Sequence, residues 1–320
     1  MAHPGPHDRE APPTGEKVRI YEVSPRDGLQ NEPEVISTDY KLALITQLVH
    51  AGLKDIEVTS FVRPSWIPQL ADARALVPRL PKVDGVRYWA LIPNRRGLER
   101  ALDVGVDHIA TFMSASESHN KRNLNRTRRE SLAGLRQVIA LAKDEGMGVR
   151  SYLSTSFGCP VEGAVAAQQV RDHVIELLDA GADQIALADT TGMGNPQMVQ
   201  SLIHTLVSTP GIELSHLSLH LHDTRGTALA NAYAGWQMGI RTFDGAVAGV
   251  GGCPYAPGAS GNAATEDLVH MFGAMELDTG IDLHRLSETG AFLANILQRP
   301  LPGRYHRYHR GLPQLAAKLA

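Results

Sequence analysis

The chain has 320 residues, of which 43% are hydrophobic and 20% are charged, and its formal net charge is −3 at pH 7. This size and composition predict one large α/β domain or two ordinary ones, with enough apolar residues to build a core. The small negative charge gives no sign of nucleic-acid binding, which would need a basic face, and no apolar run is long enough to span a membrane. The two cysteines are too few for a disulfide framework, so we expect a cytoplasmic protein.

Residues 1–17 are polar and proline-rich, which predicts a flexible N-terminal tail rather than a targeting peptide. Beyond them, short β-like runs alternate with longer amphipathic stretches. The expected strands are Val18–Val23, Asp55–Val58, Val86–Leu91, His108–Met113, Val149–Leu153, Gln184–Ala188, Leu217–Leu221 and Phe243–Val247. The expected helices are Asp39–Ala51, Gln69–Leu76, Arg95–Val104, Arg128–Glu145, Ala164–Ala180, Gln197–Val207, Thr227–Met238, Ala263–Met275 and Asp282–Leu297. Residues 298–320, with the basic run Arg304–Arg310, are expected to form a solvated C-terminal tail, and contact of this run with CoA phosphates is the alternative.

A glycine follows the end of five expected helices, as in Ala51-Gly52 and Ala180-Gly181. Glycine adopts the left-handed conformation that ends helices, so this pattern predicts a repeated βα unit. The rival fold, a doubly wound open sheet, usually has a glycine-rich phosphate loop after the first strand, where this chain has Ser24-Pro-Arg-Asp-Gly28. We therefore predict an α/β fold, a (β/α)8 TIM barrel with extra C-terminal helices, whose catalytic domain spans residues 18–297.

Polar side chains stand at the C-terminal end of nearly every expected strand, which is where TIM barrels carry their active sites. In strand order they are Arg26 and Asp27; Glu57 and Ser60; Asn94; Ser114, Glu117 and His119; Tyr152; Asp189 and Thr190; His220 and His222; and Asn262. Scattered surface polarity would not favour one end of the barrel, so we expect these residues to surround the site.

His220 and His222 close the run Leu217-Ser-Leu-His-Leu-His-Asp223. Side chains alternate faces on an extended strand, so both imidazoles point to one side and form half of a metal site. Two core histidines bonded to backbone are the alternative interpretation. Asp27 is the candidate third ligand, although Arg26 and Asp27 also fit a simple turn cap, and Asn262 could supply an amide oxygen. These donors suit Mg²⁺ or Mn²⁺ best, with Zn²⁺ or Co²⁺ as alternatives.

The segment from Gly249 to Asn262 is rich in glycine and contains a lone cysteine, Cys253. Glycines let a loop adopt positive φ and close over a ligand. A cysteine in such a loop is a candidate proton donor or nucleophile, whereas most free cysteines are inert apolar residues. We expect reactivity at Cys253 and the inert role at Cys159, which lies in a Gly-Cys-Pro turn.

Together these motifs make residues 18–297 resemble the 3-hydroxy-3-methylglutaryl-CoA (HMG-CoA) lyase family. The motifs are Val23-Ser-Pro-Arg-Asp-Gly-Leu-Gln-Asn-Glu32, Glu57-Val-Thr-Ser-Phe-Val62, Gly158-Cys-Pro-Val-Glu-Gly163, Asp189-Thr190, His220-Leu-His-Asp223 and the Cys253 loop through Val269. The resemblance implies a metal-dependent carbon–carbon lyase of leucine catabolism. Such an enzyme cleaves an HMG-CoA-like thioester to acetyl-CoA and a keto acid, acetoacetate in the case of HMG-CoA.

The resemblance also implies roles for individual residues. Asp27, His220, His222 and Asn262 would hold the metal, Arg26 would stabilise enolate charge on the thioester oxygen, and Cys253 would transfer a proton. His220 or Asp27 would take the hydroxyl proton, and Glu57 would act beside them as a catalytic residue. The substrate-binding residues would be Arg26, Gln30, Ser60, Tyr152, Asp189 and Thr190.

Because the sequence departs from the family pattern at several positions, the identity of the substrate's acyl group stays open. Ala186 and Ala188 stand where the family commonly has serine and glycine, Arg225 replaces a tyrosine, and Arg63 replaces a small residue. Citramalyl-CoA and longer 3-hydroxy-3-alkylglutaryl-CoA thioesters are therefore alternative substrates. Two different functions also stay open, a Claisen-condensing synthase of the same superfamily and a non-catalytic CoA-ester binder. We expect an acyl-CoA substrate and a homodimer or higher homo-oligomer as partners, with no nucleic acid and no membrane.

Overall fold

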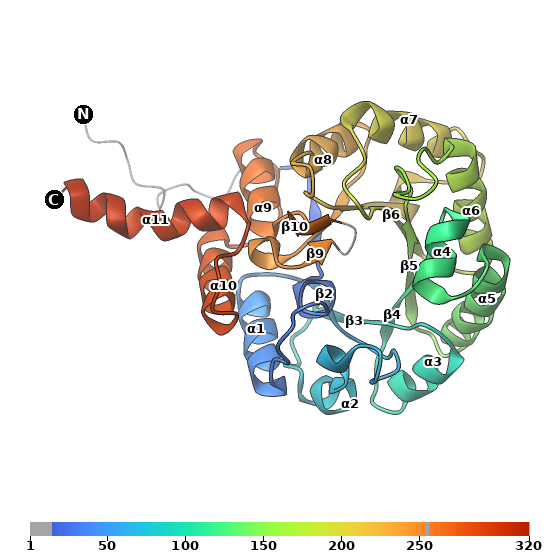
Figure 1. Cartoon of the computed structure of the whole chain (residues 1–320), viewed down its shortest axis with the longest axis horizontal. Coiled ribbons are helices and arrows are strands. Elements are labelled where there is room, and N and C mark those ends of the chain that lie inside the picture. The colour runs from blue at the N-terminus through green and yellow to red at the C-terminus, as the bar shows by residue number, and fades with distance from the viewer. Residues whose placement is uncertain (1–14, 254–255, 320) are drawn as a thin grey trace.

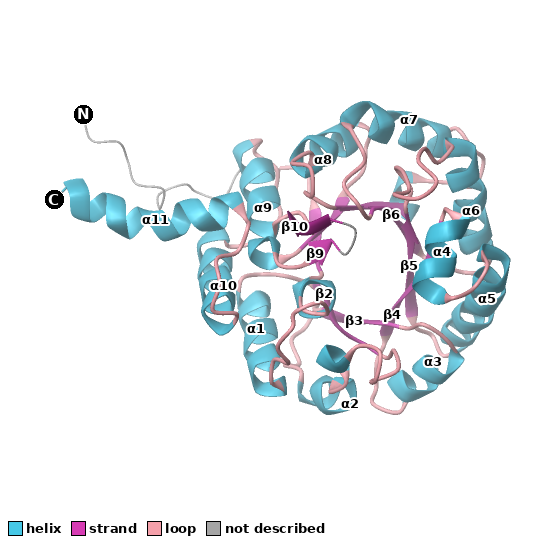
Figure 2. Cartoon of the chain, viewed as in Figure 1, coloured by secondary structure: helices cyan, strands magenta, loops and turns pink. Residues whose placement is uncertain are grey.

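The computed structural model describes residues 15–253 and 256–319, and it leaves the side chains of residues 253, 256–259 and 313–319 undescribed. Eight parallel strands close into a barrel in chain order, surrounded by helices (Figures 1 and 2). The predicted TIM barrel is confirmed. The strands are β1 Arg19–Glu22, β2 Asp55–Ser60, β3 Arg87–Leu91, β4 His108–Ser114, β5 Gly148–Ser154, β6 Gln184–Asp189, β7 Leu217–Leu221 and β8 Thr242–Gly245.

The outer helices are α1 Thr38–His50, α2 Ala73–Leu76, α3 Arg95–Leu102, α4 Glu117–Leu124, α5 Arg128–Asp144, α6 Ala167–Asp179, α7 Pro196–Val207, α8 Ala228–Gln237 and α9 Thr265–Ala274. Two more follow as α10 Leu283–Ile296 and α11 Arg304–Leu319. A short antiparallel pair, β9 Gly252–Cys253 and β10 Ala256–Ser260, lies in the loop between β8 and α9. Among the described residues, no helix is both long and apolar enough to cross a lipid bilayer.

The five glycines that were expected to end helices all adopt the left-handed backbone. Gly52, Gly105, Gly146, Gly181 and Gly239 have φ values between 73° and 104°. A side chain at these positions would strain the backbone, so the glycines turn the chain from each helix toward the next strand. The main apolar core lies between the strands and this ring of helices.

The register of neighbouring strands determines which side chains meet inside the barrel. Tyr152 on β5 lies opposite Ala186 on β6, and His220 on β7 lies opposite Asp244 on β8. Asp244 in turn lies opposite Tyr21 on β1, which closes the ring. Because residues in register point to the same face, polar side chains from strands far apart in sequence meet inside the barrel.

Three helical segments differ from the sequence prediction. The expected helix Gln69–Leu76 is divided into a 3-10 turn, Pro68–Leu70, and the short α2. The segment of α4 was not expected to be helical, because Glu-Ser-His-Asn-Lys-Arg-Asn-Leu has no apolar periodicity; Ser116 caps it by accepting a hydrogen bond from the backbone N–H of His119. Most of the expected solvated tail forms α11, which leaves the barrel beside α9 and α10 (Figure 1). Asp267 of α9 begins this helix by accepting hydrogen bonds from the backbone N–H groups of Arg304 and Tyr305.

The last three residues of the expected N-terminal tail differ from the prediction as well. Lys17 pairs with Asp278 through the backbone, and the Glu16 carboxylate binds the Arg241 guanidinium. Residues 15–17 therefore lie against the barrel, and residues 1–14 lie outside the described part of the chain.

A buried acid of α9, Glu266, lies between the loop after β8 and Gly290 of α10. Glu266 accepts a hydrogen bond from the Ala248 N–H at 2.7 Å, and its other oxygen has no partner among the described residues. That oxygen and His306 Nδ1 both crowd Gly290, where an added Cβ would lie 2.6 Å and 2.8 Å from them. Burial, aided by the negative charges of Glu22 and Asp267, raises the pKa of Glu266 to about 8. Glu266 is therefore mostly protonated at neutral pH.

We expect Glu266→Gln to be better tolerated at high pH than at low pH. Because the folded-state pKa lies above the ordinary value of 4.5, the wild type loses stability as pH rises from about 4.5 to about 8. Glutamine does not titrate and escapes this loss. The melting-temperature difference between variant and wild type should therefore be more favourable to the variant at pH 8.5 than at pH 5. Glu288→Gln on the exposed face of α10 is the control, and an equal difference at both pH values would contradict the prediction.

Candidate active site

A tight turn after β1 presents Arg26 and Asp27 at the barrel mouth. Residues Ser24–Gly28 form a single π-helical turn, closed by the hydrogen bond from Leu29 N–H to the Ser24 carbonyl oxygen. Gly28 packs directly on the segment that follows β8, since an added Cβ would lie 2.5 Å from Val250 Cγ1. Single π-helical turns are rare in proteins, and those that occur are often found at functional sites.

Buried hydrogen bonds fix the Arg26 guanidinium. Its Nε donates to Glu57 Oε1, and one terminal nitrogen donates to Asp27 Oδ1 at 2.5 Å. Glu57 is fully buried, and its second oxygen accepts from the hydroxyls of Tyr21 at 2.9 Å and Tyr152 at 2.7 Å. Burial alone would lower the pKa of Arg26, but Glu57 and Asp27 outweigh it and raise that pKa. The group is thus a fixed cation.

The two histidines meet as predicted. Their Nε2 atoms are 3.2 Å apart, and His220 Nε2 lies 4.0 Å from Asp27 Oδ2. Candidate ligand atoms of Asp27, His220 and His222 all lie within 4.8 Å of one another. On its other side, His220 Nδ1 is 3.0 Å from Asp244 Oδ2. A carboxylate there holds Nδ1 as the donor and leaves Nε2 free to bind a metal.

Asn262 completes the group. Its backbone pairs with that of His222, and its side-chain amide donates to the Val250 carbonyl oxygen at 3.3 Å. The same side chain helps to lower the pKa of Asp27. Asn262 Oδ1 is buried and has no hydrogen-bond partner among the described residues. A buried amide oxygen without a partner is costly, and a cation would satisfy it.

The protonation states of these side chains, as well as their chemical types, suit the binding of a divalent metal. Burial alone would raise the pKa of Asp27, but Arg26 and the two histidines bring it to about 2. Burial and the neighbouring His220 lower the pKa of His222 to about 3. At neutral pH the carboxylate is therefore ionised and the His222 imidazole is neutral, which are the forms that bind metals. Two imidazole nitrogens with carboxylate and amide oxygens are a donor set that fits a divalent metal ion.

Sequence reasoning missed two residues of the site, Arg150 on β5 and Asp244 on β8. Arg150 donates to both carboxylate oxygens of Asp244, and that carboxylate contacts His220. Both charged residues are buried inside short apolar strands. A charge within a strand that is buried on both faces was the available signal, because it requires a partner inside the barrel.

Not every predicted site residue joins this cluster. Gln30 does, donating to Asp27 Oδ1 at 3.1 Å. Ser60 donates to the Leu91 carbonyl oxygen on the barrel wall, and Asp189 accepts from the N–H groups of Met193 and Gly194 in the turn after β6. Thr190 accepts from the Thr155 N–H at 3.0 Å. Through these hydrogen bonds, Ser60, Asp189 and Thr190 support the wall and the loops of the barrel mouth.

Both cysteines were assigned roles from the sequence. Cys159 is fully buried, and its sulfur accepts a hydrogen bond from the Ser116 hydroxyl at 3.0 Å, in keeping with the expected structural role. The backbone of Cys253 forms β9, but its side chain lies outside the described part of the structure. The reactivity expected of Cys253 therefore stays a prediction.

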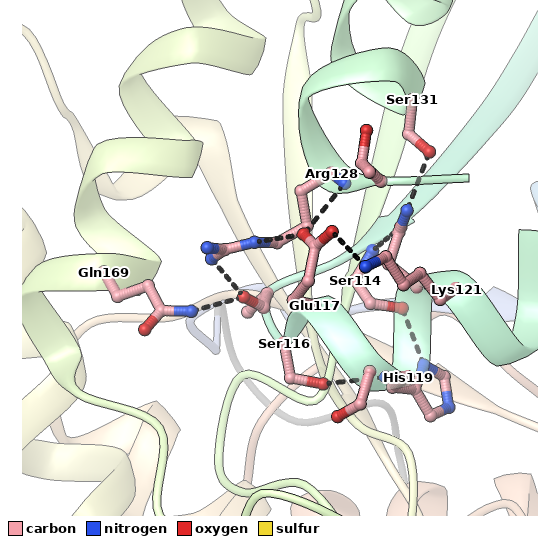
Figure 3. A network of polar contacts seen from close by, with 12 residues as sticks. Ser114, Ser116, Glu117, His119, Lys121, Arg128, Ser131 and Gln169 are labelled. Atoms are coloured by element: carbon pink, nitrogen blue, oxygen red, sulfur yellow. Dashed lines mark hydrogen bonds and ion pairs between the residues drawn. The ribbon is translucent and has the colours of Figure 1, made fainter.

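The polar residues after β4 form a separate network at the corner of β4, α4 and α5 (Figure 3). Ser114 Oγ is 2.6 Å from His119 Nδ1, and Glu117 binds the backbone and side chain of Arg128. Arg128 also donates to the Ala115 carbonyl oxygen at 2.8 Å. These groups largely satisfy one another, so the network supports the barrel mouth rather than the metal-ligand cluster.

Comparisons with known proteins identify the family of the chain. The HMGL-like family model matches residues 17–293. The chain is 47% identical to the hydroxymethylglutaryl-CoA lyase YngG of Bacillus subtilis over 292 residues, covering 91% of this chain and 97% of that protein. It is 44% identical to the cytoplasmic 3-hydroxy-3-methylglutaryl-CoA lyase of Rattus norvegicus over 284 residues, covering 89% of this chain and 82% of the relative.

Solved structures give the same result. The crystal structure of the Bacillus subtilis HMG-CoA lyase superposes with a TM-score of 0.90 at 46% identity, covering 92% of this chain and 98% of that one. An HMG-CoA lyase from Acinetobacter baumannii, in complex with coenzyme A and 3-methylmalate, has a TM-score of 0.86 at 38% identity, covering 91% and 94%. The resemblance found in the sequence motifs is confirmed, and the chain belongs to the HMGL-like family.

Proposed function

We propose that this protein cleaves 3-hydroxy-3-methylglutaryl-CoA, or a closely related thioester, to acetyl-CoA and a keto acid. The observation that carries the proposal is the meeting of Arg26 with Asp27, His220 and His222 in one buried cluster at the barrel mouth. Relatives that are 41–47% identical are named HMG-CoA lyases, and a structural neighbour was crystallised with coenzyme A.

The reaction explains why a fixed guanidinium is needed. The hydroxyl proton on C3 leaves, the C2–C3 bond breaks, and its electrons move to C2, where the thioester carbonyl accepts them as an enolate. Arg26, held by Glu57, is proposed to donate to that oxygen as its negative charge develops. A preoriented donor stabilises the transition state more than the bound substrate, so its main effect falls on kcat.

A divalent cation held by Asp27, His220, His222 and Asn262 would act as a Lewis acid toward the substrate oxygens. We propose Mg²⁺ or Mn²⁺ in this role. His220 and Asp27 are the candidates for taking the hydroxyl proton; we propose Asp27, because Asp244 and the cation would occupy both nitrogens of His220. Cys253 is proposed to return a proton to C2. Gln30, Tyr152, Ser60, Asp189 and Thr190 remain proposed substrate contacts; of these, Gln30 and Tyr152 lie nearest to the cluster.

A specific observation supports the larger alkyl substrates as a second candidate. Leu91, Ala110, Phe112 and Ala186 form an apolar cluster with Tyr152, apart from the main core. Tyr152 joins this cluster to the site, because its hydroxyl donates to Glu57 and its ring lies 5.4 Å from that of His220. An apolar wall beside the predicted metal ligands would suit an alkyl group on C3 of the substrate.

We expect acetyl-CoA release from HMG-CoA when the protein is assayed with Mg²⁺ or Mn²⁺. The panel should include citramalyl-CoA and a 3-hydroxy-3-alkylglutaryl-CoA with a longer alkyl group, and kcat/KM ranks the substrates. Incubating acetyl-CoA with 2-keto acids tests the condensing synthase. Absence of acetyl-CoA release from every thioester would refute the lyase, and binding without turnover would favour the CoA-ester binder.

The biological setting is a proposal of the same kind. We propose a cytoplasmic enzyme of leucine catabolism that assembles as a homodimer or higher oligomer. Relatives are named both as cytoplasmic and as mitochondrial enzymes. Sedimentation of the purified protein tests the assembly.

A further inference from the structure

Arg150 occupies the centre of the barrel just below the site. The residue is 1% exposed. Its guanidinium carbon lies 3.9 Å from the centre of the Tyr21 ring and 4.9 Å from that of Tyr152. Two aromatic rings therefore restrict the movement of a cation that is already removed from water.

One side of Arg150 reaches a predicted metal ligand. Its terminal nitrogens donate to both oxygens of Asp244, and one of them also donates to the Ser218 hydroxyl at 2.8 Å. Asp244 Oδ2 lies 3.0 Å from His220 Nδ1. The orientation of the His220 imidazole thus depends on Asp244, which Arg150 holds in a forked geometry that a lysine cannot reproduce.

The other side of Arg150 reaches the proposed enolate-binding group. Its NH1 donates to the Tyr152 hydroxyl at 3.3 Å, and that hydroxyl donates to Glu57 at 2.7 Å. Glu57 in turn accepts from Arg26. One buried guanidinium therefore connects the two halves of the site by hydrogen bonds alone.

We propose that Arg150 is a positioning residue that holds both His220 and Arg26 in their working orientations, through Asp244 and through Tyr152–Glu57. This inference rests on the proposed function. Three carboxylates, Asp27, Glu57 and Asp244, face two guanidiniums, Arg26 and Arg150, in this interior. After each guanidinium is matched with one carboxylate, one negative charge is left next to the two histidines. This charge favours the binding of a cation there.

The same barrel offers a matched control. Asp55 at the opposite end is 1% exposed and accepts two hydrogen bonds from Arg87 and one from the Trp89 indole. Asp55 is a buried aspartate at the start of β2, away from the strand ends that carry the predicted metal ligands, and its partner Arg87 is 35% exposed. Asp55→Asn therefore measures the structural cost of breaking such a pair, and Asp244→Asn measures that cost together with any effect on His220.

The test is Mn²⁺ binding to the wild-type protein and its variants, followed by the EPR signal of free Mn²⁺, together with melting temperature, kcat and KM. Arg150→Lys and Asp244→Asn are expected to weaken Mn²⁺ binding by about 10- to 100-fold, as loss of outer partners of a metal site does, and to lower kcat more than they change KM. Asp55→Asn is expected to lower the melting temperature and to leave Mn²⁺ binding within about twofold of wild type.

Contrary results would each overturn a defined part of the proposal. Unchanged Mn²⁺ binding in folded Arg150→Lys and Asp244→Asn, or an equal weakening in Asp55→Asn, would overturn the positioning role. If Arg150→Lys does not fold, Ser218→Ala removes one hydrogen bond to Arg150 and should weaken binding by about threefold, and no change would count against the proposal. A wild-type protein that binds no Mn²⁺ and cleaves no thioester would instead overturn the proposed function.

Discussion

Arg26→Gln is expected to lower kcat by about 10²- to 10³-fold, with little change in KM. Glutamine retains a hydrogen-bonding amide but loses the charge that opposes a developing enolate. Because the interaction strengthens only as the C2–C3 bond breaks, its loss should raise the barrier without weakening substrate binding to the same degree. Steady-state kinetics with the best thioester of the panel would measure both constants.

A double variant makes the Arg26 result interpretable. The substitution leaves Glu57 without a charged partner in a buried position, which is destabilising in itself. Arg26→Gln combined with Glu57→Gln removes both charges, so recovery of the melting temperature without recovery of kcat would separate folding from chemistry. A variant whose KM rises while kcat is retained would place Arg26 in substrate binding alone.

Asp27→Asn is expected to abolish both tight metal binding and cleavage. Asp27 supplies the only charged ligand of the predicted set, and asparagine keeps its shape without its charge. We expect Mg²⁺ or Mn²⁺ affinity to fall by about 100-fold or more, since outer partners alone contribute 10- to 100-fold. Chelation of the wild type should have the same effect on turnover, and adding Mg²⁺ or Mn²⁺ should restore it.

A second buried carboxylate provides the comparison for Asp27. Asp189 stands at the end of β6 and accepts hydrogen bonds from two backbone N–H groups. Asp189→Asn should therefore leave metal affinity near that of wild type, whatever its effect on substrate binding. Equal loss of metal affinity in both variants, or full turnover in excess chelator, would remove Asp27 and the metal from the proposed reaction.

Local sequence signals were sufficient for the barrel and for much of the site. Helix-ending glycines marked the repeated unit, and the spacing of His220 and His222 placed both imidazoles on one face of β7. Asp27 could be added because polar residues at strand ends converge at one end of a barrel. Each of these inferences needs only the order of the elements, and the structure agrees with each.

The missed features depend on register and on long-range contacts. Asp244 and Arg150 sit within strands rather than at their ends, and only the alignment of β7 with β8 shows that Asp244 reaches His220. Polarity at a strand end also does not show which groups face the metal ligands and which bond to the wall or the loops. Ser60 and Thr190 therefore stay predicted substrate contacts, although each forms a hydrogen bond to neighbouring backbone in the structure. The helix α11 depends on a cap from α9, which no local pattern reveals.

The pairing of β1 with β8 has a consequence for how activity could arise during folding. Asp27 follows the first strand, whereas His220, His222 and Asn262 come late in the chain, and Glu22 joins the two edges by accepting hydrogen bonds from Val247 N–H and the Thr265 hydroxyl. A nascent or truncated polypeptide that lacks either edge would therefore lack part of the predicted metal-ligand set. The protein should therefore begin to bind the metal only when β1 pairs with β8 and closes the barrel, which happens late in synthesis.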